Sequence, residues 1–230
     1  MTTKEAATEG LEARLYCAPG EFVDSDHPAI VAFARAAAPA DLAPVEKAKR
    51  FYLAAREIRY NPDLDYSDLE IYRASSVLNA GSAYCVGKAA LFAALCRAVD
   101  IPARVAFADV TNHLSSEKLR EQMGTNYFAW HGFTEALLDG NWVKASPTFN
   151  STLCTRYGVA PLDFDGKSDA LLQSYDGAGR SFMKYEVLHG AFHDVPAKFL
   201  VAEMARLYPS LKGGQRGTSG GMESQVPAAG

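Results

Sequence analysis

The sequence predicts an α+β fold in which a buried helix that begins at a cysteine packs on an antiparallel sheet. Three observations predict it. Residues 86–99 carry an apolar run that leaves almost no polar face, and a helix that is apolar all round is buried. The dipeptide Asp139-Gly140 separates two β-prone segments and predicts a hairpin. Apolar residues at helical spacing within residues 28–38 and 44–58 predict two further helices.

Each of these two N-terminal helices has a proline as its start signal. Pro28 begins the first, alanine-rich stretch, and Pro44 stands in the first turn of the second, where the missing N–H of proline is not needed. Residues 60–77 follow with Asp-Leu pairs and turn signals, and within them we expect an extended segment at 69–72. This region indicates no function.

Cys85 stands at the start of the buried helix. The preceding residues 79–84 include Gly and Ser and are predicted to form a loop, so the thiol lies where the unpaired N–H groups of the helix gather. A helix N-terminus lowers the pKa of a cysteine from about 8.5 toward neutrality and so favours a nucleophilic thiolate. The alternative is an inert cysteine in the core, which describes most free cysteines.

The hairpin has one register that makes chemical sense. With Asp-Gly as the two turn residues, Leu137 faces Trp142 and Glu135 faces Lys144, which are an apolar pair and an opposite-charge pair. A slip of one residue would place the glutamate beside an apolar side chain. We therefore predict this register.

The same register places His131 opposite Thr148. If the second strand continues, Ser146 and Asn150 are the diagonal neighbours of the imidazole and lie within side-chain reach. Histidine accepts and donates protons near neutral pH, and a hydroxyl or an amide can fix its tautomer. We therefore expect His131 to act as the base for a Cys85 nucleophile, with Ser146 or Asn150 as its orienting partner.

The other elements have shorter patterns. Residues 103–110 predict a strand and residues 115–123 a short polar helix. Beyond Asn150 the pattern breaks into short pieces, until residues 195–207 predict a final amphipathic helix capped by Asp194.

The length fits one domain. We predict a single domain at residues 1–208, with its core at about 44–160 and helical flanks. Residues 209–230 form a tail whose Gly, Ser and Pro content predicts disorder.

Two blocks of sequence surround the cysteine and the histidine. Residues 81–104 include Tyr-Cys-Val-Gly and end in Asp-Ile-Pro-Ala-Arg, and residues 131–148 run from His-Gly-Phe-Thr-Glu through Asp-Gly-Asn-Trp to Ser-Pro-Thr. Both blocks resemble the transglutaminase-like superfamily of cysteine enzymes, relatives of papain, and stand in the expected order. The resemblance implies a papain/transglutaminase-like core with a catalytic pair at Cys85 and His131.

The sequence departs from that family at Ser146, where the usual residue before Pro-Thr is an aspartate. A serine accepts a hydrogen bond but carries no negative charge. A bacterial subset of the family is similar in its Ser/Thr-Pro-x-Phe-Asn pattern, which ends here at Asn150. Papain-like enzymes also place a side-chain amide six residues before the nucleophile, which implies an oxyanion role for Asn79 beside the backbone N–H of Cys85. An ordinary turn residue is the alternative for Asn79.

These residues permit acyl transfer on amide bonds through a thioester. The thiolate of Cys85 attacks the carbonyl, His131 protonates the departing amine, and water or an amine accepts the acyl group. The expected enzyme is thus an amidase, a peptidase or a transglutaminase-type acyltransferase, acting on a peptide, protein or small amide. The alternative is a catalytically inactive binding module that keeps the fold.

Composition excludes several other classes. The 230-residue chain has a formal net charge of -4 with scattered basic residues, so no nucleic-acid partner is expected. No apolar run is long enough to span a bilayer, and the N-terminus lacks an apolar signal core, which favours the cytoplasm. His189 and His193 have a metal-ligand spacing without a third ligand, so no metal and no cofactor are expected. The oligomeric state stays open.

Overall fold

The computed structural model describes residues 10–11, 13–112, 124–172 and 183–209 of the chain. The helix predicted at 115–123 lies outside the described residues, and so does the predicted tail apart from residue 209. Within the described ranges, no helix is long and apolar enough to cross a membrane.

The main sheet has four antiparallel strands in the order β5-β4-β3-β6. Their bounds are Ala103–Asn112 for β3, Tyr127–Leu138 for β4, Asn141–Ala145 for β5 and Met183–Phe192 for β6. A small parallel pair is formed by β1 (Arg59–Tyr60) and β2 (Ser82–Ala83). The predicted hairpin register is confirmed, because Leu137 pairs with Trp142 and Glu135 with Lys144.

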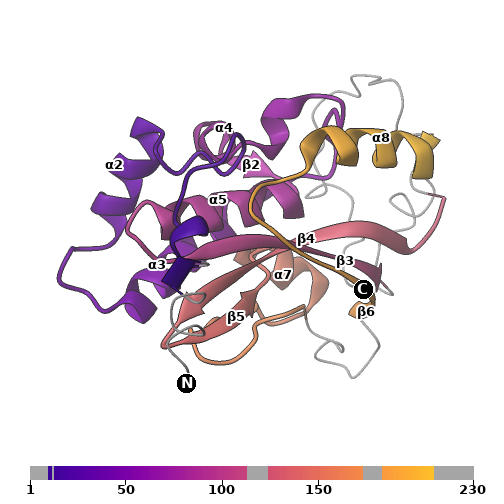
Figure 1. The fold of residues 1–230 in the computed structure, drawn as a ribbon. Coiled ribbons are helices and arrows are strands. Elements are labelled where there is room, and N and C mark those ends of the chain that lie inside the picture. The colour runs from indigo at the N-terminus through magenta and orange to yellow at the C-terminus, as the bar shows by residue number, and fades with distance from the viewer. Residues whose placement is uncertain (1–9, 12, 113–123, 173–182, 210–230) are drawn as a thin grey trace, which may run out of the picture.

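Helices cover one face of this sheet. Helix α5 (Cys85–Arg97) lies across β3 and β4, and Figure 1 shows α2 (Pro28–Ala37), α3 (Pro44–Glu57) and α4 (Ala74–Ala80) on the same side. The remaining elements are the 3₁₀ helix η1 (Leu69–Tyr72), α7 (Ser151–Tyr157) and α8 (Ala197–Leu207). The predicted α+β fold, with a buried cysteine-initiated helix on an antiparallel sheet, is confirmed.

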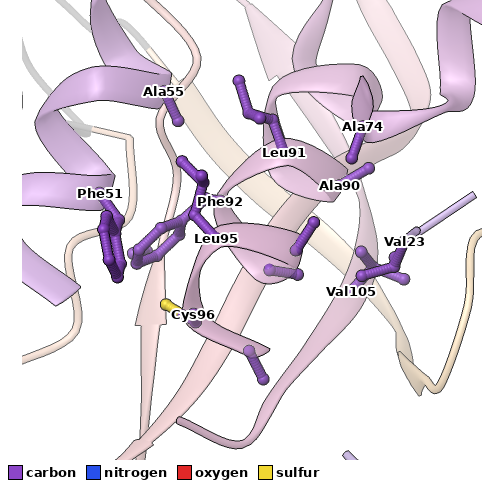
Figure 2. Packing of buried hydrophobic residues seen from close by; sticks show 14 of the residues in the cluster. Val23, Phe51, Ala55, Ala74, Ala90, Leu91, Phe92, Leu95, Cys96 and Val105 are labelled. Atoms are coloured by element: carbon purple, nitrogen blue, oxygen red, sulfur yellow. The ribbon is translucent and has the colours of Figure 1, made fainter. Parts of the chain in front are cut away.

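Helix α5 is the centre of the core. Every residue after Cys85 is buried along its length, as its apolar sequence predicts. Figure 2 shows Phe92 and Leu95 of this helix beside Phe51 and Ala55 of α3, while Ala90 points toward Ala74 of α4. The helix therefore joins the helical layer to the sheet.

Lys88 is a buried charge on this apolar helix. Its Nζ donates to the carbonyl oxygens of Arg56 at 2.8 Å, Ile58 at 2.6 Å and Thr148 at 2.7 Å. Burial lowers the pKa of Lys88 to about 7, but three carbonyls need three N–H donors, which only the ammonium form supplies. These bonds tie the end of α3 and the segment after β5 to α5.

Two local predictions are wrong for the same reason. Residues 69–72 form a 3₁₀ helix instead of an extended segment, because Asp68 accepts a hydrogen bond from the backbone of Glu70. The predicted loop at 79–84 is helical up to Ala80, and Gly81 ends α4 in the left-handed region with φ +63°. Local capping chemistry decided both segments.

Asp194 has a different role from the predicted helix cap. Helix α8 starts after Pro196 without a side-chain cap. The carboxylate of Asp194 instead accepts hydrogen bonds from the backbone N–H groups of Glu21, at 2.6 Å, and Val23, at 2.8 Å. It therefore ties the N-terminal segment to the connection between β6 and α8.

The three bonds of Lys88 generate a stability prediction. Lys88→Met keeps the stem but leaves three carbonyls without their donor, so we expect a loss of about 3 kcal/mol or more in the free energy of unfolding. Urea denaturation measures this loss. The matched control is Lys198→Met on the exposed surface of α8, for which we expect a change within about 0.5 kcal/mol. Equal effects of the two substitutions would contradict the role given to Lys88.

Candidate active site

Cys85 is the first residue of α5, and backbone N–H groups surround its sulfur. The N-cap residue Tyr84 makes no side-chain capping bond, so the first N–H groups of the helix stay available. Backbone N–H groups of Gly132, Val86 and Cys85 itself face the thiol and favour its charged form. Two different elements, α5 and β4, therefore place donors around one sulfur atom.

Gly132 permits the close approach of β4 to the start of α5. A Cβ atom at this position would lie 2.8 Å from Cα of Val86 and 3.2 Å from its backbone nitrogen. Any other residue would push the strand away from the helix. Since His131 directly precedes this glycine, the contact brings the histidine strand to the cysteine.

His131 is bonded to a neutral hydroxyl network. Its Nε2 lies 3.0 Å from Oγ of Ser146, which lies 3.0 Å from Oγ1 of Thr148. Tyr185 of β6 also bonds Ser146 and packs edge-on against the imidazole. In the part of the chain that the structure describes, no carboxylate is bonded to this network. Ser146 therefore occupies the position of an orienting partner without supplying charge.

Burial favours the neutral forms of Cys85 and His131. It raises the pKa of the Cys85 thiol to about 11, against the opposing effect of the backbone N–H groups and of Lys88. Burial also lowers the pKa of His131 to about 4. The expected lowering of the cysteine pKa is therefore wrong for this structure, because desolvation outweighs the N-terminus of the helix. Both pKa values favour the neutral thiol and the neutral imidazole at neutral pH.

The two asparagines predicted for the site lie elsewhere. Oδ1 of Asn150 accepts a hydrogen bond from the backbone N–H of Tyr60, at 3.1 Å, and so joins α7 to β1. Asn79 is exposed on α4 and does not line the pocket at Cys85. Of the two expected partners of His131, the structure brings only Ser146 to the imidazole. The N–H donors that face the sulfur of Cys85 belong to the backbone.

A second polar cluster, which the sequence analysis missed, lies next to His131. Asp109 accepts hydrogen bonds from the backbone N–H of Trp130, at 2.9 Å, from Nε2 of His189, at 2.6 Å, and from the hydroxyl of Tyr127, at 2.7 Å. Burial opposes ionisation of Asp109, but these donors together hold its pKa below the ordinary value. The indole of Trp130 stacks on His189 with ring centroids 4.0 Å apart.

Trp130 has an unusual backbone. Its φ of +59° lies in the left-handed region, which costs a non-glycine residue about 1 to 3 kcal/mol, and β3 carries a register shift opposite, at Ala108/Val110. The hydrogen bond from its N–H to Asp109 and the stacking of its indole on His189 hold Trp130 in this conformation. The sequence signals this cluster only by placing Trp130 directly before His131. His189, which shares a metal-ligand spacing with His193, bonds Asp109 instead. Among the described residues, no group of three His, Cys, Asp or Glu side chains is arranged to hold a metal.

Cys85 and His131 both line one pocket. Its walls come from β1, β3, β4, β6, the start of α5 and the segments after β1 and β5. Leu200 and Met204 of helix α8 and its C-cap residue Tyr208 close one side. The cavity volume is about 70 Å³, several times the roughly 10 to 15 Å³ that one water needs on this measure. The site therefore has room for part of a small organic molecule beside the thiol.

The lowered pKa of His131 generates a prediction about acid stability. Between its ordinary value of 6.5 and about 4, the unfolded chain binds a proton that the folded protein excludes. The free energy of unfolding therefore falls as the pH drops through this window, by up to about 3 kcal/mol. Urea titrations at several pH values should therefore give a smaller slope of the free energy of unfolding against pH for His131→Gln than for the wild type, with a total difference of up to about 3 kcal/mol across this window. The exposed His27→Gln serves as control, and a slope unchanged in His131→Gln would contradict the prediction.

Comparison with known proteins places the chain in a family. Residues 31–147 match the family model of the transglutaminase-like superfamily. Among solved structures, a candidate cysteine protease from Cytophaga hutchinsonii is similar at 16% sequence identity with a TM-score of 0.41. The match covers 76% of this chain and 53% of that one, so the chain spans about half the length of that protein. No curated protein sequence matches. The chain belongs to the transglutaminase-like superfamily.

Proposed function

We propose that the protein is a cysteine-dependent enzyme that transfers acyl groups from amides through a thioester on Cys85, with His131 as base and acid. One observation carries the proposal: Gly132, the residue after the histidine, directs its N–H at the sulfur of Cys85 at the start of α5. A strand and a helix that converge in this way give a thiol, a base and oxyanion donors in one pocket.

The first step starts from the neutral pair. Since Nε2 of His131 is occupied by Ser146, Nδ1 is the ring nitrogen left to take the thiol proton. Sγ of Cys85 attacks the carbonyl carbon as its proton moves to the imidazole, and backbone N–H groups at the helix start stabilise the oxyanion. The C–N bond then breaks, His131 returns the proton to the amine, and a thioester remains.

The second step releases the acyl group. Water or a primary amine attacks the thioester, His131 accepts the proton of the attacking group, and the thiol of Cys85 is restored. In this proposal Nε2–H of His131 donates to Oγ of Ser146 through both steps, and this bond holds the tautomer that leaves Nδ1 free to take a proton. Because Ser146 supplies no negative charge, it stabilises the transient imidazolium less than an aspartate would.

The substrate class is proposed as a peptide, protein or small amide. Hydrolysis and amine transfer share every step up to the thioester, so they differ only in the acceptor that enters. All four cysteines are free, which supports work in a reducing compartment such as the cytoplasm.

Acylation of Cys85 is the direct test. With 4-nitrophenyl acetate we expect one rapid release of nitrophenol per chain and an acetyl group on the Cys85 peptide by mass spectrometry. Cys85→Ala should abolish both, and His131→Ala should slow acylation by about 10² to 10⁴-fold. Since a protonated His131 cannot accept the thiol proton, the wild-type rate should fall as the pH drops through about 4. Acetylation of Cys17 at the same rate as Cys85 would favour the inactive binding module.

Substitutions of Ser146 and Asn150 test which of the two residues orients His131. Ser146→Ala removes the partner of Nε2, so we expect acylation to slow by about tenfold, and Ser146→Thr should keep the hydroxyl and most of the rate. Asn150→Ala removes the bond to Tyr60 and should lower stability by about 1 kcal/mol while leaving the acylation rate of the folded protein unchanged. A larger rate loss in Asn150→Ala would assign the orienting role to the asparagine.

A further inference from the structure

The pocket at Cys85 has no charged wall. Of the described residues that line it, none carries a formal charge near pH 7, since burial keeps His131 neutral. Its walls are mainly aromatic rings and aliphatic chains, among them Tyr66, Phe128, Trp130 and Met204. Moving an ionised group into such surroundings costs several kcal/mol unless a counter-charge meets it.

The polar tips of two wall residues are already bonded to the backbone. The hydroxyl of Tyr66 donates to the carbonyl of Pro62 at 2.8 Å. The hydroxyl of Tyr208 accepts from the N–H of Ala129 at 2.7 Å and donates to the carbonyl of Tyr127 at 3.1 Å. These residues therefore present their rings to the cavity, and burial of apolar surface is the interaction they offer a ligand.

Helix α8 makes this wall fixed. Tyr208 at its C-terminus is bonded to β4 just before the catalytic histidine, and Phe199 packs edge-on against Trp130 with ring centroids 4.9 Å apart. Leu200 and Met204 lie between these two anchors, and both line the pocket. The contacts of Tyr208 and Phe199 with β4 therefore hold the apolar wall in place on either side of Leu200 and Met204.

We propose that this pocket binds the acyl part of the substrate and that the acyl donor is an amide with an uncharged aliphatic or aromatic acyl chain. This inference rests on the proposed function. In the acylation step the C–N bond of that amide breaks, the S–C bond to Cys85 forms, and the thiol proton leaves with the amine.

The order of the two steps assigns the pocket to the acyl side. The acyl group stays on Cys85 while the amine departs and the acceptor enters, so it gains from a fixed, water-poor binding place. The amine and its replacement must exchange with solvent and gain nothing from an anchored wall. A chain held in the pocket also excludes water from the thioester until an acceptor arrives.

Esters that share one leaving group test the acyl preference. We expect the second-order rate of Cys85 acylation by 4-nitrophenyl esters to rise by about tenfold or more from acetate to hexanoate. The hemisuccinate ester, whose chain ends in a carboxylate, should react at least about tenfold more slowly than the butyrate ester. Rates that ignore the acyl chain, or that favour the hemisuccinate, would overturn the proposal.

A variant that places a charge in the pocket wall tests whether this wall binds the acyl chain. Met204→Glu puts a carboxylate at the pocket, so the preference for hexanoate over acetate should fall to near unity, while Met204→Leu should keep it. Ala202→Glu adds the same charge on the exposed side of α8 and should leave the preference unchanged. Circular dichroism checks that each variant is folded. A folded Met204→Glu variant with the wild-type preference would place the chain elsewhere.

Binding to an inactive variant separates this inference from the proposed function. Cys85→Ala cannot form a thioester, but its pocket is intact, so hexanamide should raise its thermal unfolding midpoint more than succinamate does. If no ester acylates the wild type while hexanamide still binds, the enzymatic proposal fails and the apolar site stands. If esters acylate Cys85 without chain preference and hexanamide does not bind, the inference of an apolar acyl site fails and the enzymatic proposal stands.

Discussion

The close contact between Gly132 and Val86 is the constraint on which the candidate site depends. It lets a strand pass against the N-terminus of a helix at a distance that no larger residue allows. Other contacts fix both elements in place. Helix α5 packs against α2, α3 and α4, and β4 pairs with β3 and β5. The cysteine at the first position of the helix and the histidine before the glycine therefore line the same pocket.

The same burial that creates this contact sets the charge state of the site. An apolar pocket disfavours both thiolate and imidazolium, and the N–H groups at the start of α5 offset only part of this effect. Ser146 fits such surroundings, because a buried carboxylate there would need a counter-charge while the resting imidazole is neutral. The serine therefore bonds the neutral imidazole without adding a charge to the apolar pocket.

The sequence predicted those parts of the site that depend on local patterns. The hairpin register follows from the Asp-Gly turn and its side-chain pairs, and the buried helix follows from its apolar run. The position of Asn150 could not be predicted in this way, because β5 ends at Ala145 and the chain then turns to meet β1. Asn79 belongs to α4, which continues to Ala80 and ends at Gly81, so its side chain is exposed and does not face the thiol.

Long-range contacts explain the rest of what was missed. Asp109, Trp130 and His189 come from three strands, and nothing local predicts the positive φ of the tryptophan. Yet this cluster decides how β4 enters the site, since the strained residue directly precedes His131. Trp130 also packs on α8, the helix that supplies the apolar wall. Trp130 therefore connects β4, the strand that carries His131, to helix α8, which lines the pocket.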